Sequence, residues 1–127
     1  MTEPPWLDQH LILLLHDDIL DATGGAAGVR DEGLLASALA RPLNRFAYEG
    51  VTDFVELAAT YAVAIASNHP FIDGNKRSAF MALGLFLEEN GLRLIAEDDD
   101  ATEVMMAVAR SDMTIETLTD WLRPRVA

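Results

Sequence analysis

The chain has no cysteine and only one lysine among its 127 residues. The absence of cysteine excludes disulfide bonds and cysteine-ligated metals, and it fits a reducing compartment. Cations are scarce altogether, with 9 lysine and arginine residues against 21 aspartate and glutamate residues and a formal net charge of −12. Because nucleic-acid binding depends on clustered cations, this balance argues against a direct nucleic-acid partner. A small anion such as a nucleotide can still bind where charge is inverted locally, and the acidic surroundings suit Mg²⁺.

Long apolar runs and leader-like segments are also missing. The apolar run Leu11–Leu15 is far shorter than a membrane span. The first six residues are acidic and contain proline, which is unlike a secretory signal. We therefore expect a cytoplasmic protein with no membrane partner.

Aromatic residues make up only 7% of the chain, and the alternation typical of half-buried strands is largely missing. The length and the 50% hydrophobic content suit one globular domain over residues 1–127. We predict a mainly α fold. Helices are expected over residues 6–21, from 31 to the proline at 42, after 53, and over 78–89, 101–110 and 114–123. A loop or small hairpin is expected over 42–50, and an extended stretch over 92–96.

Local sequence signals support these boundaries. Asp31 and Thr114 are predicted N-caps, and Asp53 with Glu56 resembles a capping box. The helix after Asp53 is apolar nearly all round and should be central. The apolar face predicted for the first helix is made of leucines and one isoleucine: Leu7, Leu11, Leu14, Leu15 and Ile19.

The most informative stretch is residues 69–77, His-Pro-Phe-Ile-Asp-Gly-Asn-Lys-Arg, which links two apolar helices. It places the only lysine, Lys76, beside Arg77 at the start of a helix. A helix N-terminus carries about +0.5 of an elementary charge, so exposed cations there cost roughly 0.3–1 kcal/mol. The N–H groups of the first turn, with Gly74 allowing close approach of the backbone, already form an anion site. We predict that phosphate binds here.

Each residue of the motif also has an ordinary structural interpretation. In a helix–loop–helix turn, Phe71 would be a core anchor, His69 a satisfied histidine, and Asp73, Gly74 and Asn75 turn residues. The turn alone does not explain their combination. His69 is a possible base, Asp73 a carboxylate able to take Mg²⁺, and residues 74–77 a phosphate cradle. Transfer from a nucleotide to a hydroxyl requires these parts.

The motif closely resembles the signature of the Fic/Doc proteins, specifically the death-on-curing (Doc) branch. Segments 28–35 and 38–42 also resemble the part of Doc toxins that precedes their flap. The resemblance implies a helical bundle with a small flap loop or hairpin. It implies His69 as general base, Asp73 as the Mg²⁺ ligand and Phe71 as the loop anchor. It further implies two groups of residues: a nucleotide-phosphate site at Gly74, Asn75, Lys76 and Arg77, and a target-facing flap at Phe46, Tyr48 and Glu49.

Position 76 separates two reaction types within this resemblance. The larger Fic group transfers AMP and typically reads Gly-Asn-Gly-Arg with a second arginine three residues on, where this chain has Lys76 and Phe80. In the Doc branch, this departure accompanies a reversed nucleotide pose that presents the γ-phosphate. The Doc pattern has alanine at the position of Gly74. The resemblance implies a protein kinase that uses ATP and Mg²⁺ and whose family target is a threonine of elongation factor Tu. AMP transfer and a non-catalytic binding module are the alternatives.

An inhibitory motif of the form Ser/Thr-x-x-x-Glu-Gly/Asn is incomplete here, because Arg45 and Leu85 stand four residues before Glu49 and Glu89. By analogy with Doc, a separate Phd-like antitoxin is expected, with a disordered C-terminal segment that folds on this domain.

Two other features carry no predicted site. His10 and His16 are six residues apart and share no helix face, so both are predicted to be surface or boundary residues. Residues 24–28, Gly-Gly-Ala-Ala-Gly, lack the spacing of a dinucleotide-binding turn and are predicted to be a flexible loop.

Overall fold

The structure, a computed structural model, describes residues 3–127 and is mainly α-helical over them. The elements in chain order are α1 (Gln9–Thr23), α2 (Glu32–Glu49), α3 (Phe54–Asn68), α4 (Asn75–Glu89), α5 (Asp98–Ala109), α6 (Ile115–Leu122) and a 3₁₀ turn, η1 (Arg123–Arg125). Over residues 3–127, β-structure is limited to two isolated antiparallel bridges, which pair Val29 with Phe71 and Leu94 with Val126. The predicted fold class is confirmed.

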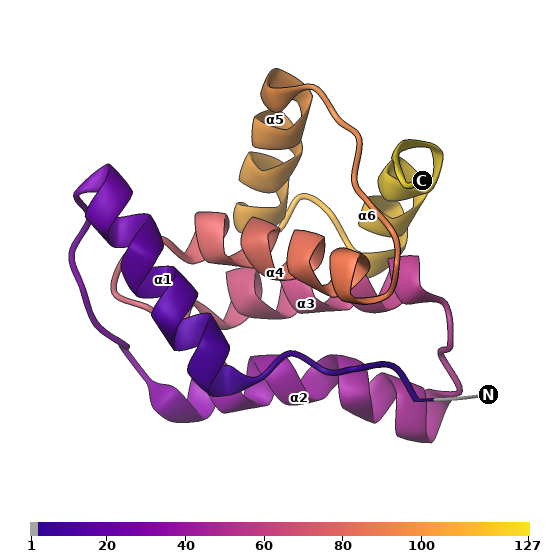
Figure 1. Ribbon diagram of the computed structural model, residues 1–127, viewed down its shortest axis with the longest axis horizontal. Coiled ribbons are helices and arrows are strands. Elements are labelled where there is room, and N and C mark those ends of the chain that lie inside the picture. Colours follow the sequence, from indigo (N-terminus) through magenta and orange to yellow (C-terminus); the bar gives the residue numbers. More distant parts are fainter. Residues whose placement is uncertain (1–2) are drawn as a thin grey trace.

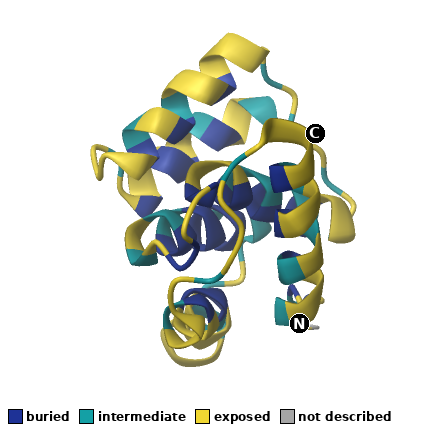
Figure 2. Cartoon of the chain, turned by 90° about the vertical axis from the view of Figure 1, so that its left-hand side faces the viewer, coloured by how far each residue is buried: buried dark blue, intermediate teal, exposed yellow. Residues whose placement is uncertain are grey.

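Helices α3 and α4 lie side by side through the middle of the molecule (Figure 1). Helices α2 and α6 pack on α3, while α1 crosses α4 and α5 contacts both central helices. The central pair is rich in buried alanines, which let the helix backbones approach closely; they are Ala58, Ala59, Ala62 and Ala64 of α3 and Ala79 and Ala82 of α4. The buried residues accordingly gather on the inner faces of the helices (Figure 2).

The predicted N-caps reflect local hydrogen bonds. The Asp31 carboxylate accepts the N–H of Leu34 at 3.0 Å, and Thr114 forms a reciprocal capping box with Thr117. Asp53 caps α3 by accepting the N–H of Val55 at 2.9 Å. The capping box predicted there is wrong, because the side chain of Glu56 forms an ion pair with Arg45 of α2 instead of bonding back to Asp53.

The prediction of a loop or hairpin over residues 42–50 is wrong, because α2 continues through Pro42 to Glu49. Proline removes one backbone hydrogen bond and is unfavourable inside a helix. Contacts with the rest of the fold hold the last turns in place. The Arg45 guanidinium binds Glu56 of α3 at 2.8 Å and donates to the Thr60 hydroxyl at 2.9 Å. Phe46 packs edge-on against Trp6, with ring centroids 5.5 Å apart.

Helix α1 presents a different face to the core from the one predicted. The buried positions are Ile12, His16 and Leu20, which recur every four residues, whereas Leu11 and Leu14 are exposed. Because residues 11–15 are all apolar, hydrophobic periodicity cannot indicate which face of this helix is buried. The correct face contains a histidine.

The stretch after α4 runs back beside the C-terminus. The backbone of Arg93 exchanges two hydrogen bonds of 2.9 Å with that of Ala127, and the N–H of Ile95 donates to the carbonyl of Arg125 at 2.6 Å. The extended stretch predicted over residues 92–96 is thus tied to the chain end. No helix of residues 3–127 combines the length and apolar character needed to cross a membrane.

Candidate functional site

The motif loop, residues 69–74, joins the end of α3 to the start of α4. Its first residue, His69, caps α3 in the left-handed conformation at φ 52°, which non-glycine residues seldom adopt. Arg30 stabilises this end by donating to the carbonyls of His69 at 2.8 Å and Asn68 at 2.9 Å. A cation is favourable here, because the last carbonyls of a helix carry partial negative charge.

Residues 24–28 form a loop, as predicted, and the segment between α1 and α2 to which they belong, here called the strap, hydrogen-bonds across the motif loop. The N–H of Ile72 donates to the carbonyl of Gly28 at 3.1 Å, and the N–H of Arg30 donates to the carbonyl of Pro70 at 2.7 Å. The glycines permit this approach. A Cβ on Gly25 would lie 2.7 Å from Asp73 Oδ2, closer than real Cβ contacts allow.

Asn75 holds the loop closed from inside. Its side-chain oxygen accepts the N–H of Phe71, and its side-chain nitrogen donates to the carbonyl of the same residue, both at 2.9 Å. The Asn75 side chain is buried and both polar ends are used. Of the predicted phosphate contacts, Asn75 therefore has only its backbone N–H to offer. Phe71 itself has no exposed surface.

The start of α4 carries free donors and free cations. The helix begins at Asn75, three residues earlier than predicted, because Gly74 adopts φ 79° and serves as N-cap. The first backbone bond of the helix runs from Ser78 to the Gly74 carbonyl, so over the described chain the N–H groups of Asn75, Lys76 and Arg77 have no backbone acceptor. Neither Lys76 nor Arg77, both exposed, pairs with a carboxylate of residues 3–127. These donors and cations give this end of α4 the chemistry that suits an anion.

His69 and Asp73, at the beginning and near the end of the motif loop, both have exposed side chains. No hydrogen bond within residues 3–127 occupies the His69 imidazole, which leaves it available to an incoming hydroxyl. One oxygen of Asp73 accepts the Gly74 N–H at 2.8 Å, and the other lies 3.4 Å from the N–H of Ala26. Over the same residues, no three His, Cys, Asp or Glu side chains gather into a metal site. A single carboxylate does suit Mg²⁺, which proteins often hold through one carboxylate together with substrate phosphates and water.

His16 belongs to the site although the sequence placed it at the surface or boundary, and that prediction is wrong. The residue is 1% exposed. Its ring stacks on Phe71, with centroids 3.7 Å apart and planes within 9°, and its Nε2 lies 2.7 Å from the carbonyl oxygen of Asp73. One signal could have revealed it: Ile12 and Leu20 stand four residues before and after it, on the same helix face. His10, by contrast, is exposed as predicted.

A cleft of about 770 Å³ opens beside the cationic start of α4. Helices α1, α4 and α5 and the stretch after α4 form its walls, and its lining includes Ile19, Lys76, Arg77, Phe80, Ala101 and Met105. A volume in this range is typical of small-molecule sites. Phe80 contributes an apolar surface to this cleft.

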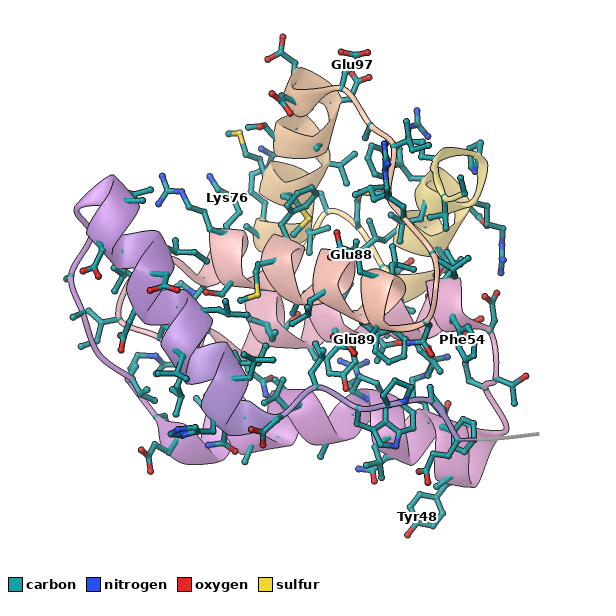
Figure 3. The ribbon with its side chains drawn as sticks, viewed as in Figure 1. Tyr48, Phe54, Lys76, Glu88, Glu89 and Glu97 are labelled. Carbon is teal, nitrogen blue, oxygen red and sulfur yellow. The ribbon has the colours of Figure 1, made fainter. Side chains whose placement is uncertain are left out.

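The predicted flap residues lie away from the motif loop. Phe46, Tyr48 and Glu49 form the last turns of α2, and Tyr48 is 84% exposed. Figure 3 shows Tyr48 at the lower right of the molecule and Lys76 well apart from it at the upper left. Glu49 pairs with Arg45 of its own helix at 3.6 Å. In this structure the segment closest to the motif is therefore the strap between α1 and α2.

The profile of the Fic/DOC family matches residues 6–87, which include the strap, the motif loop and α4. The chain belongs to the Fic/Doc family. Two relatives place it in the Doc branch. The chain is 34% identical over 112 residues to "Protein kinase doc" of Escherichia phage P1, covering 88% of each protein. It is 39% identical over 102 residues to "Toxin Doc" of Mycolicibacterium smegmatis, covering 76% of this chain and 77% of that relative.

Proposed function

We propose that this chain is a Doc-like toxin that transfers the γ-phosphate of a nucleoside triphosphate, such as ATP, to a protein hydroxyl. The observation that carries the proposal is the start of α4, where the N–H groups of the first turn have no backbone acceptor and neither Lys76 nor Arg77 pairs with a carboxylate of residues 3–127. The loop that leads into this helix carries His69, whose imidazole makes no hydrogen bond within the same residues. The names of the two relatives, a protein kinase and a toxin, support both halves of the proposal.

In the proposed reaction, Lys76, Arg77 and the free N–H groups of α4 hold the phosphates and balance their charge. The acceptor oxygen forms a bond to the γ-phosphorus, the bond to the β-γ bridging oxygen breaks, and the nucleoside diphosphate leaves. His69 takes the proton from the acceptor hydroxyl. Asp73 would hold Mg²⁺, which supplies further neutralisation of phosphate charge.

The choice of the γ-phosphate rests on positions 76 and 80. A lysine at 76 fills space that a glycine would leave open, and Phe80 cannot make the phosphate contact of an arginine. Both differences match the Doc pattern rather than that of the AMP-transferring group. We further propose, by family resemblance, that the acceptor is a threonine of elongation factor Tu and that a Phd-like antitoxin binds the chain.

The test supplies ATP labelled at either the α- or the γ-phosphate, together with Mg²⁺, to the purified protein and elongation factor Tu. We expect label to reach a threonine from the γ-position only. The His69→Ala variant should lose at least about a hundredfold in rate, which is typical when a general base is removed. His10→Ala is the matched control, since this exposed histidine lies outside the site, and it should keep the full rate.

Label arriving only from the α-position would replace phosphorylation with AMP transfer. Transfer that survives His69→Ala would overturn the assignment of the base. If elongation factor Tu takes no label but another protein in a translation extract does, the kinase proposal stands and the proposed target falls.

A further inference from the structure

His16 is the only buried histidine among the described residues, and it contacts the motif loop at two points. It comes from α1, more than fifty residues before the loop. Its partner at 2.7 Å is the Asp73 carbonyl oxygen, which has no proton to give. The Nε2 atom of His16 must therefore carry the hydrogen and donate it.

This bond lies near the end of the loop, just before α4 begins. Asp73 is an exposed residue, and its carbonyl immediately precedes Gly74, the N-cap of α4. The His16 ring also covers the face of Phe71. His16 also lies over Gly74, since a Cβ there would be 3.4 Å from His16 Nε2, an ordinary van der Waals contact. One side chain thus fixes both the anchor and the peptide between the carboxylate and the anion site.

We propose that His16 is a positioning residue, whose Nε2–H sets the orientation of the Asp73–Gly74 peptide and hence of the Asp73 carboxylate and the first N–H groups of α4. It does not reach the substrate. The effect on transfer rests on the proposed function, whereas the effect on the loop does not. Small displacements of groups that position a substrate can cost large factors in rate.

The test compares His16→Gln with His16→Met. These unbranched side chains are similar in size, but only glutamine keeps an N–H donor near the position of Nε2. A third variant, His16→Phe, keeps an aromatic ring against Phe71 without the donor. Ile12→Val is the control for a general weakening of α1, because Ile12 is fully buried one turn earlier on the same face.

Two measurements are made on each variant. The first is the rate of phosphate transfer with its dependence on Mg²⁺ and ATP. The second is hydrogen exchange of three loop amides with known acceptors: Phe71 to the Asn75 side chain, Ile72 to Gly28 and Gly74 to the Asp73 carboxylate. We expect His16→Met and His16→Phe to lose about tenfold in kcat, as one misplaced buried hydrogen bond allows, and to exchange these amides faster. His16→Gln and Ile12→Val should stay within about threefold of the parent in both measurements.

The proposal is overturned if His16→Met and His16→Gln behave alike, or if loop exchange in both donor-free variants equals that of the parent. If the unmodified protein transfers no phosphate at all, the proposed function fails, but the exchange data still decide whether His16 orders the loop. A variant that does not fold is replaced in the comparison by the other donor-free variant.

Discussion

Within the motif, side chains divide between those that hold the loop and those that face outward. Phe71 and Asn75 are buried and engaged with the protein itself, while His69, Lys76 and Arg77 are exposed and make no side-chain hydrogen bond or ion pair over residues 3–127. The sequence alone predicted a role for each of these residues. It could not separate the two groups, because direction depends on how the loop folds back on itself.

Tyr61 illustrates how burial shifts the chemistry of a single residue. Its hydroxyl oxygen accepts the N–H of Leu7 at 3.1 Å, and burial raises the pKa of this phenol from 10.0 to about 12. A raised folded-state pKa stabilises the fold fully below about pH 10. That contribution is lost as the pH rises from about 10 to 12, because the unfolded tyrosine ionises first.

We therefore expect the free energy of unfolding to fall more steeply between pH 9 and about pH 11 in the parent than in Tyr61→Phe, as measured by urea denaturation. At pH 8 the variant should be about 1 kcal/mol less stable, since the Leu7 N–H loses its acceptor. Tyr48→Phe is the control, because Tyr48 is 84% exposed. Equal alkaline slopes for Tyr61→Phe and the parent would contradict this expectation.

Among the elements, the strap between α1 and α2 links the end of α3 to the start of α2. The Arg30 side chain donates to two carbonyls at the end of α3. In the other direction, the Asn68 side chain donates to the carbonyl of Leu34 in α2 at 2.9 Å. These bonds tie together segments that lie almost forty residues apart. They also fix the strained backbone of His69 before any substrate arrives.

Arg30→Ala should lower the free energy of unfolding by about 1–2 kcal/mol, because two charge-assisted hydrogen bonds are lost from an exposed position. Arg41→Ala provides the comparison, since Arg41 is exposed on α2 and its side chain makes no bond within the described chain. Urea denaturation of both variants measures the difference. Equal stabilities would show that the guanidinium adds nothing to the end of α3.

Element boundaries set by neighbouring residues could be predicted, whereas those set by distant contacts could not. Asp31 and Thr114 cap their helices through side chains three residues or fewer from their partners. Pro42 was expected to end a helix, but contacts of Arg45 with α3 and of Phe46 with Trp6 carry α2 past it. His16 was missed for the same reason, because its partners lie on a loop that the first helix meets only after folding.

At the scale of the whole molecule, acidic residues outnumber basic ones by more than two to one. Four ion pairs are formed within residues 3–127, so most carboxylates have no cationic partner there. Three of them, Asp98, Asp99 and Asp100, occupy the first turn of α5, where the helix dipole favours negative charge. The remainder repel one another across the surface.

Raising KCl from about 10 to about 150 mM should therefore increase the melting temperature, since it shortens the screening length from about 30 to about 8 Å. The double variant Asp17→Asn, Asp18→Asn removes two exposed charges from α1 and should show a smaller increase. Calorimetry at both salt concentrations measures the effect. A melting temperature that falls with KCl would mean that the ion pairs outweigh the repulsion.

The single lysine of the chain allows selective covalent labelling. An amine-reactive reagent meets one side chain in the entire sequence, Lys76, which is exposed and borders the cleft beside α4. Apart from the terminal amine, a single fluorophore or crosslinker would thus be attached at the proposed anion site without engineering. The extent of labelling would then report directly on whether a ligand covers that site.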